Sequence, residues 1–172
     1  MDIPQQLLAG RSLAHVKQLS VHIGGDKSKF DALMHCFLGD NPLLAQRAAH
    51  VMSWCCDAHP DLILPYLPDV IGLAKSDTST ALKRNGIRVL QNIDIPEEYQ
   101  GLVAELCFDL LTARGESIAV KVFSMTVLSN ICVGEPELSK ELRMIIEDQM
   151  PYASPAFLSR ARRILKRLQR GR

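Results

Sequence analysis

The chain has 172 residues, of which 47% are hydrophobic, and its 20 Lys and Arg residues against 19 Asp and Glu residues give a formal net charge of +1. This balance excludes a strongly basic tail protein that coats nucleic acid and an acidic disordered protein. The length suits one domain or one short repeat array. A folded chain of this size buries about 70% of the surface that the unfolded chain exposes.

A helical stripe of apolar and small residues recurs five times, at steps of 36, 38, 38 and 37 residues. One copy consists of Leu82, Gly86, Val89, Leu90 and Ile93, whose spacing places them on one face of a helix. The second position is small in every copy, where the residues are Ser12, Ala48, Gly86, Ser124 and Ala161. Because Gly inside a helix costs about 1 kcal/mol relative to Ala, its presence in this column indicates close packing. The stripes predict first helices at 4–20, 42–57, 79–93, 116–133 and 154–170.

Second helices are expected between the first ones, at 28–38, 61–75, 96–112 and 135–149. Five prolines fall where a helix should begin, namely Pro42, Pro60, Pro96, Pro136 and Pro155. Asn41 and Ser154 precede two of these prolines and are expected to cap their helices. Pro65 and Pro68 should either confine the helix at 61–75 to a start near Tyr66 or kink it.

The alternation of these helices predicts an all-α fold, an α-α superhelix of about four and a half helical-hairpin repeats of roughly 38 residues. We expect one domain over residues 1–172, and the predicted repeats are 4–38, 42–75, 79–112 and 116–149, followed by a capping helix at 154–170.

Residues 39–49, with the sequence GDNPLLAQRAA, resemble the start of a HEAT repeat, in which an Asp turn precedes a helix that carries an Arg and small residues. Residues 62–68 resemble the second helix of that repeat, and Ser76-Asp77 with Lys83-Arg84 echo the pattern one unit later. The stretch 113–122 departs from the pattern because it lacks the Asp. The resemblance covers nearly the whole chain and implies a HEAT-like or armadillo-like solenoid, a fold that serves many functions.

The segments 119–125 and 159–166 are similar to a group of short bacterial HEAT-like proteins, some of which carry the name adenylosuccinate lyase. That lyase has a much longer chain and a Ser-Ser-x-Met-Pro-x-Lys-x-Asn loop. The single Met-Pro here, Met150-Pro151, is followed by Tyr152-Ala153-Ser154 and lacks the Lys and the Asn. The sequence therefore argues against lyase activity.

Charge is divided unevenly between the two sets of helices. The expected first helices carry 13 basic and 2 acidic residues, whereas the second helices carry 4 basic and 12 acidic residues. The HEAT resemblance implies that second helices line the concave face, which would then be acidic.

We predict a non-catalytic interaction or scaffold module whose concave face binds a protein or a basic peptide. The candidate contacts are Glu105, Asp109, Glu141 and Glu147. A solvated helix surface, with several acids placed in first turns to suit the helix dipole, is the alternative.

The expected C-terminal helix is basic, with seven Lys and Arg residues and no acid after residue 153. Its candidate basic patch consists of Arg160, Arg163, Lys166 and Arg167, and Arg172 adds to the charge. Such a patch would bind phosphate groups or an acidic partner, and the alternative is a solubilising cap on the last repeat. If the basic end of one molecule met the acidic face of another, the chain would self-associate weakly; otherwise it is a monomer.

No motif for catalysis, a metal or a cofactor is recognised, because HExxH, a phosphate loop and a nucleophile elbow are all absent. The five Cys residues, without a CxxC pair, are expected to be reduced and buried in a cytoplasmic protein, and no membrane span is expected. We therefore predict that the protein is not an enzyme and has no cofactor. The alternative function is nucleic-acid binding in the manner of HEAT-like alkylpurine DNA glycosylases, through the outer face and the C-terminal helix.

Overall fold

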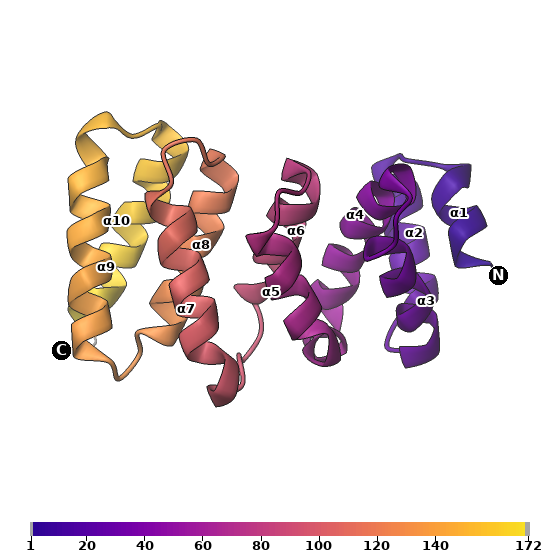
Figure 1. The fold of residues 1–172 in the computed structure, drawn as a ribbon, viewed down its shortest axis with the longest axis horizontal. Coiled ribbons are helices and arrows are strands. Elements are labelled where there is room, and N and C mark those ends of the chain that lie inside the picture. The colour runs from indigo at the N-terminus through magenta and orange to yellow at the C-terminus, as the bar shows by residue number, and fades with distance from the viewer. Residues whose placement is uncertain (1, 171–172) are drawn as a thin grey trace. The chain divides into compact units, whose positions relative to one another are not determined.

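The computed structural model describes residues 2–170, and within them it holds ten α-helices, two 3-10 helices and no strand (Figure 1). The elements are α1 (Ile3–Ala9), α2 (Leu13–Ile23), α3 (Lys27–Phe37), α4 (Pro42–Ala58), η1 (Pro60–Tyr66), α5 (Leu67–Lys75), α6 (Thr80–Leu90), α7 (Glu97–Thr112), α8 (Ile118–Ile131), α9 (Pro136–Gln149), η2 (Met150–Tyr152) and α10 (Pro155–Arg170). The prediction of an all-α repeat fold is confirmed.

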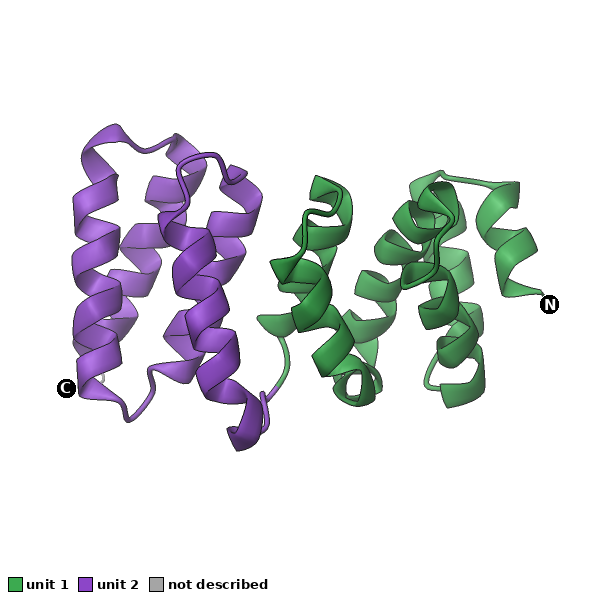
Figure 2. Ribbon diagram, in the orientation of Figure 1, with its two compact units in different colours: residues 1–93 green, residues 94–172 purple. Residues whose placement is uncertain are grey.

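The chain divides into two compact units, Met1–Ile93 and Asp94–Arg172 (Figure 2). The first holds α1 to α6, and the second holds α7 to α10. The boundary falls inside the expected repeat 79–112, so α6 and α7 belong to different units. Packed pairs inside the units join a second helix to the first helix that follows it, as α5 joins α6 and α7 joins α8.

In unit 1, α4 is the central helix and packs against α2, α3 and α6. Its buried face includes Ala48, Val51 and Met52, which belong to the predicted stripe. In the neighbouring helix α6, Gly86 is buried as the small-residue column requires, and a Cβ built on it would lie 3.4 Å from Cγ1 of Val70 in α5. At this position of the small column, α5 therefore lies in van der Waals contact with α6.

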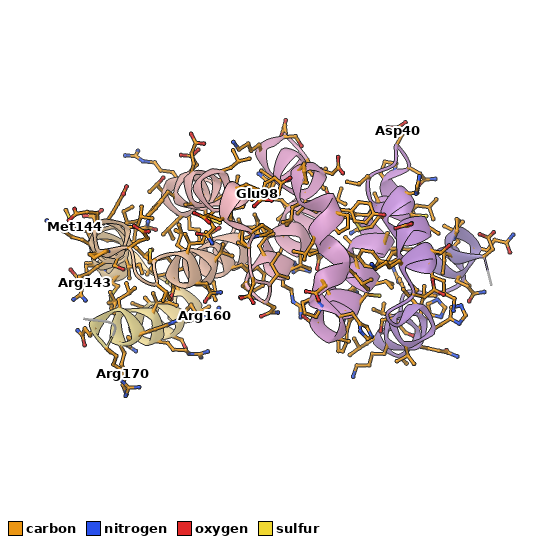
Figure 3. All side chains as sticks on the ribbon, turned by 90° about the horizontal axis from the view of Figure 1, so that it is seen from below. Asp40, Glu98, Arg143, Met144, Arg160 and Arg170 are labelled. Atoms are coloured by element: carbon orange, nitrogen blue, oxygen red, sulfur yellow. The ribbon has the colours of Figure 1, made fainter. Side chains whose placement is uncertain are left out.

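In unit 2, α8 has the central position and packs against α7, α9 and α10. Its stripe residues Val120, Ser124 and Leu128 are fully buried. Figure 3 looks at the side chains from below and shows α7 and α9 in one row of this unit and α8 and α10 in the other. The row of α7 and α9 corresponds to the predicted second helices.

The single helix expected at 4–20 is wrong, because the chain forms two helices there, α1 and α2. Gly10 adopts an extended conformation after α1, and the Ser12 side chain accepts a hydrogen bond of 3.2 Å from the His15 backbone N–H at the start of α2. Ser12 is therefore a capping residue and not a buried member of the small column, and Leu8, which the stripe places inside, is 49% exposed. The local preference of the Gly and the Ser for a helix break overrides the continuing apolar period.

The helix expected at 61–75 begins as the 3-10 helix η1, which contains Pro65, and becomes α-helical only from Leu67. The prediction from Pro65 and Pro68 is thus confirmed. The capping predictions are also confirmed, since the Asn41 side chain accepts from the N–H groups of Leu43 and Leu44 and the Ser154 hydroxyl accepts from that of Phe157. Gly24 ends α2 with a φ of 52°, a left-handed conformation that Gly adopts without strain.

Candidate functional site

The four acidic candidate residues all lie on exposed helix surface in unit 2. Glu105 and Asp109 stand one turn apart on α7, opposite the buried stripe of that helix. Leu102 lies one turn before them on the same exposed side and is 39% exposed. Helix α7 contains four acidic residues and no Lys or Arg.

The remaining two candidates lie on α9, where Glu141 and Glu147 are both exposed. Met144 lies between them on the same side of the helix and is 61% exposed. Figure 3 shows Met144 projecting outward from α9. Each of the two helices thus presents an apolar side chain beside carboxylates, and on α9 the exposed Lys140 also lies one turn from Met144.

We call the exposed sides of α7 and α9 the acidic face, defined by Leu102, Glu105, Asp109, Glu141, Met144 and Glu147. Both helices pack on α8, which fixes them within one compact unit. The structure therefore brings the predicted acidic residues of two repeats onto the same row of helices.

The basic candidate residues of α10 differ from one another in their contacts. Arg160 donates a hydrogen bond to the Thr126 hydroxyl, and Arg167 donates one of 2.7 Å to Oδ1 of Asn130, so both hold α10 to α8. Arg163 and Lys166 are exposed. Arg172 lies outside the described residues. Two of the four residues in the predicted basic patch are thus also packing residues between neighbouring first helices.

A cavity that the sequence analysis missed lies in unit 1 and has a volume of about 250 Å³. Its walls include three arginines and two histidines, namely Arg11, Arg47, Arg84, His15 and His50. The arginines stand 36 and 37 residues apart, which is close to the repeat step. That spacing was the available signal, because residues one repeat step apart come to lie beside each other, although Arg11 lies in the turn between α1 and α2.

A second cavity of unit 1 has a volume of about 530 Å³ and lies between α3 and η1. The Tyr66 hydroxyl donates a hydrogen bond to Asp31 at its edge. Burial, followed by this hydrogen bond and by the negative charges of Asp31 and Asp69, raises the pKa of Tyr66 to about 12. Tyr66 therefore stays protonated at neutral pH and acts as a hydrogen-bond donor, not as a base.

The thiols are unsuited to nucleophilic chemistry. All five Cys residues are free and buried, as expected from the sequence. Burial raises the pKa of Cys55 and of Cys107 to about 12, and that of Cys132 to about 11, so the thiolate form is scarce at neutral pH. Within residues 2–170 there is also no group of three His, Cys, Asp or Glu side chains placed to hold a metal ion.

The fold is that of an all-α helical repeat protein, in which stacked helices share one core within each unit. The chain matches the HEAT repeat domain over residues 3–168, and it therefore belongs to the HEAT repeat family. Proteins of this family typically act as non-enzymatic scaffolds that mediate protein interactions. A search of the curated proteins found no match to the chain.

The helices are too short or too polar to serve as membrane spans in the part of the chain that the structure describes. The amphipathic helices instead bury their apolar stripes against one another inside the units.

Proposed function

We propose that the protein is a non-catalytic interaction module whose acidic face binds a basic segment of a partner protein. The observation that carries this proposal is the pairing of exposed apolar and acidic side chains, with Leu102 beside Glu105 on α7 and Met144 beside Glu141 on α9. An amphipathic segment that carries Lys or Arg beside Leu or Met complements both components.

Leu102 and Met144 are two of ten large hydrophobic side chains that the described residues expose, and both of them lie beside carboxylates. The carboxylates attract a basic partner over roughly 10 Å at moderate ionic strength and speed its association. Leu102 and Met144 then supply apolar area, at about 25 cal/mol per Å² removed from water, which does not depend on salt. The electrostatic part of the affinity should therefore decline with salt, whereas a residual apolar part should persist.

A labelled amphipathic peptide with four Lys and two Leu residues at helical spacing is a direct probe. We expect binding to the full chain to weaken as NaCl rises, and to weaken about tenfold in the double variant Glu105→Lys with Asp109→Lys, which corresponds to about 1.4 kcal/mol. The matched control is Asp40→Lys with Asp77→Lys, which makes the same change of charge at exposed positions of unit 1.

The control variant should bind the peptide as the wild type does. Leu102→Ala with Met144→Ala should lower the affinity that remains at high salt. Equal binding by the two charge-reversal variants, or binding that salt does not weaken, would contradict the proposal.

A second candidate function is nucleic-acid binding through α10. The observation in its favour is that α10 carries six Lys and Arg residues and no acidic residue, with Arg163 and Lys166 exposed. Duplex DNA retention should then be salt-dependent and should be lost in Arg163→Glu with Lys166→Glu. These two positions are preferable to Arg167, whose replacement would also break the hydrogen bond to Asn130. Retention that survives this double change would exclude α10 as the binding element.

A further inference from the structure

The cavity of about 250 Å³ in unit 1 is formed on the surface of α4, between the turn that joins α1 to α2 on one side and α6 on the other. Arg11 comes from the turn, Arg47 and His50 come from α4, and Arg84 comes from α6. Gln46 and Asn85 complete its polar wall, and no Asp or Glu of the described chain lines it. The cavity therefore collects positive charge and hydrogen-bond donors from three segments, the turn after α1 and helices α4 and α6.

The break between α1 and α2 shapes one wall of this cavity. A Cβ built on Gly10 would lie 2.9 Å from Cγ of His15, so the imidazole occupies space that a side chain at Gly10 would need. His15 Nε2 lies 2.7 Å from the Gln6 carbonyl oxygen, and it must donate because that oxygen can only accept. The ring is thus held by packing and by one hydrogen bond.

Arg47 is likewise held in place before any ligand is present. Its Nη1 donates hydrogen bonds of 2.8 Å to the carbonyl oxygens of Leu7 and Leu8, near the C-terminal end of α1. These carbonyls have no partner within the short helix, so the guanidinium satisfies them and is fixed at the cavity wall. A cation that is already ordered loses little conformational entropy on binding.

The positive charges of the cavity are not compensated locally. Burial, and then the neighbouring charges of Arg84 and Arg88, lower the pKa of His50. Arg88 is paired with Asp57, but that carboxylate does not line the cavity. Anion binding would relieve the repulsion that these cations exert on one another.

We propose that this cavity binds the phosphate group of a small molecule, with Arg11 and Arg84 as its charged contacts and His50 beside them. Guanidinium groups match the geometry of phosphate oxygens in two-point hydrogen bonds, and a phosphate monoester carries more charge than a carboxylate. The volume lies just below the range of about 300–1,000 Å³ typical of pockets for drug-sized ligands, so it suits a phosphate with few further atoms.

The neighbouring cations argue against a nucleic-acid strand as the occupant. A strand would need a track of further free cations beside the cavity, to hold its successive phosphates. Lys17 instead lies over the Trp54 ring, 5.0 Å from its centroid, and Arg88 is bonded to Asp57. The arginines that line this one cavity are Arg11, Arg47 and Arg84, a set that suits a single phosphate group better than a strand. This inference concerns unit 1 and is independent of the acidic face in unit 2.

The test uses the full chain with inorganic phosphate and glycerol 3-phosphate as probes, at constant ionic strength set with NaCl. We expect both probes to shift the imidazole NMR signals of His50 and His15, whereas those of His35, exposed on α3, should not move. Calorimetry should give an affinity at least tenfold lower in Arg11→Gln with Arg84→Gln. Arg162→Gln with Arg163→Gln, which removes two exposed positive charges of α10, should leave the affinity unchanged.

The two probes separate the sources of the phosphate. Binding of both at similar affinity indicates that the free ion is sufficient, and tighter binding of glycerol 3-phosphate indicates a phosphorylated small molecule; both results support the site. No change in the His50 signal at 20 mM of either probe would overturn the proposal, as would equal affinity in the two double variants. Displacement of the phosphate by a 12-residue DNA strand or by an Asp-rich peptide, at a hundredfold lower concentration, would overturn the assignment to a small molecule.

Discussion

Arg88 of α6 donates a hydrogen bond of 2.6 Å from Nη2 to Oδ2 of Asp57 in the last turn of α4. Its Nη1 also donates to the Ser53 carbonyl oxygen at 3.2 Å, and Asn92 donates to the other carboxylate oxygen of Asp57 at 3.3 Å. An acidic residue at a helix C-terminus is opposed by the helix dipole. The guanidinium therefore offsets an unfavourable charge on α4 while it joins α4 to α6.

The first prediction is that Arg88→Leu lowers the free energy of unfolding by about 1–2 kcal/mol, because charged hydrogen bonds to Asp57 are lost and the pair is only partly exposed. Urea denaturation followed by circular dichroism measures this change. A double-mutant cycle with Asp57→Asn should give a coupling of about 0.5–1 kcal/mol. Strictly additive effects would show that the two side chains do not stabilise each other.

The second prediction concerns the tight contact at Gly10. We expect Gly10→Ala to destabilise the chain by about 1–2 kcal/mol, because the new Cβ would displace the His15 ring, which is hydrogen-bonded to Gln6. The backbone of Gly10 is extended and accepts any residue, so the cost is steric. Combining the change with His15→Ala should recover most of the loss in urea denaturation. If the double variant is no more stable than Gly10→Ala alone, the cost of the added Cβ does not come from the His15 ring.

The third prediction is a stabilising change at Gly101 on the exposed side of α7. A Cβ there would meet nothing within 4 Å, and Gly inside a helix costs about 0.5–1 kcal/mol relative to Ala. Gly101→Ala should therefore raise the melting temperature by a few degrees. A lower melting temperature would show that the added Cβ is not accommodated at this position.

Fold class could be predicted from the sequence because the stripe residues recur at nearly constant steps and each stripe has to be buried against a neighbour. The same reasoning failed in part at 4–20, where Leu8 and Ser12 fit the spacing of the stripe but are exposed, whereas Val16 is buried as predicted. The helix is interrupted at Gly10, and the only sequence signal for this interruption is a Gly followed two residues later by a Ser that caps α2.

The acidic face follows from helical periodicity, since Glu105 and Asp109 lie at positions that the buried stripe leaves outside. Periodicity gives the side of a helix on which a residue lies but not its partner. It could not show that Arg160 and Arg167 bond to residues of α8, nor that Arg11 and Arg84 meet at one cavity. Such contacts depend on the spacing between helices, which packing determines.

The fourth prediction tests the small-residue column at Gly86. The nearest neighbour of a Cβ is Cγ1 of Val70 at 3.4 Å, so Ala fits with little adjustment, whereas Leu would force α5 and α6 apart. We expect Gly86→Ala to change stability by less than about 1 kcal/mol and Gly86→Leu to cost about 1–3 kcal/mol. Differential scanning calorimetry of the two variants compares them directly. Similar melting temperatures for both would mean that the contact between α5 and α6 is loose.

The fifth prediction concerns pH and His50, whose pKa is lowered from the ordinary value of 6.5 by burial and by the charges of Arg84 and Arg88. The folded chain therefore takes up this proton at lower pH than the unfolded chain does. The stability that comes from keeping His50 neutral is present above pH 6.5 and is lost as the pH falls through the lowered value.

We expect unfolding free energies measured between about pH 7.5 and about pH 5 to fall less steeply in His50→Gln than in the wild type. Arg84→Gln should flatten the curve in part, because it removes one of the two repelling charges and leaves Arg88. If His50→Gln and the wild type lose stability in parallel, the arginines do not act on this imidazole, and the positive field that favours an anion in the cavity is weaker than its lining residues imply.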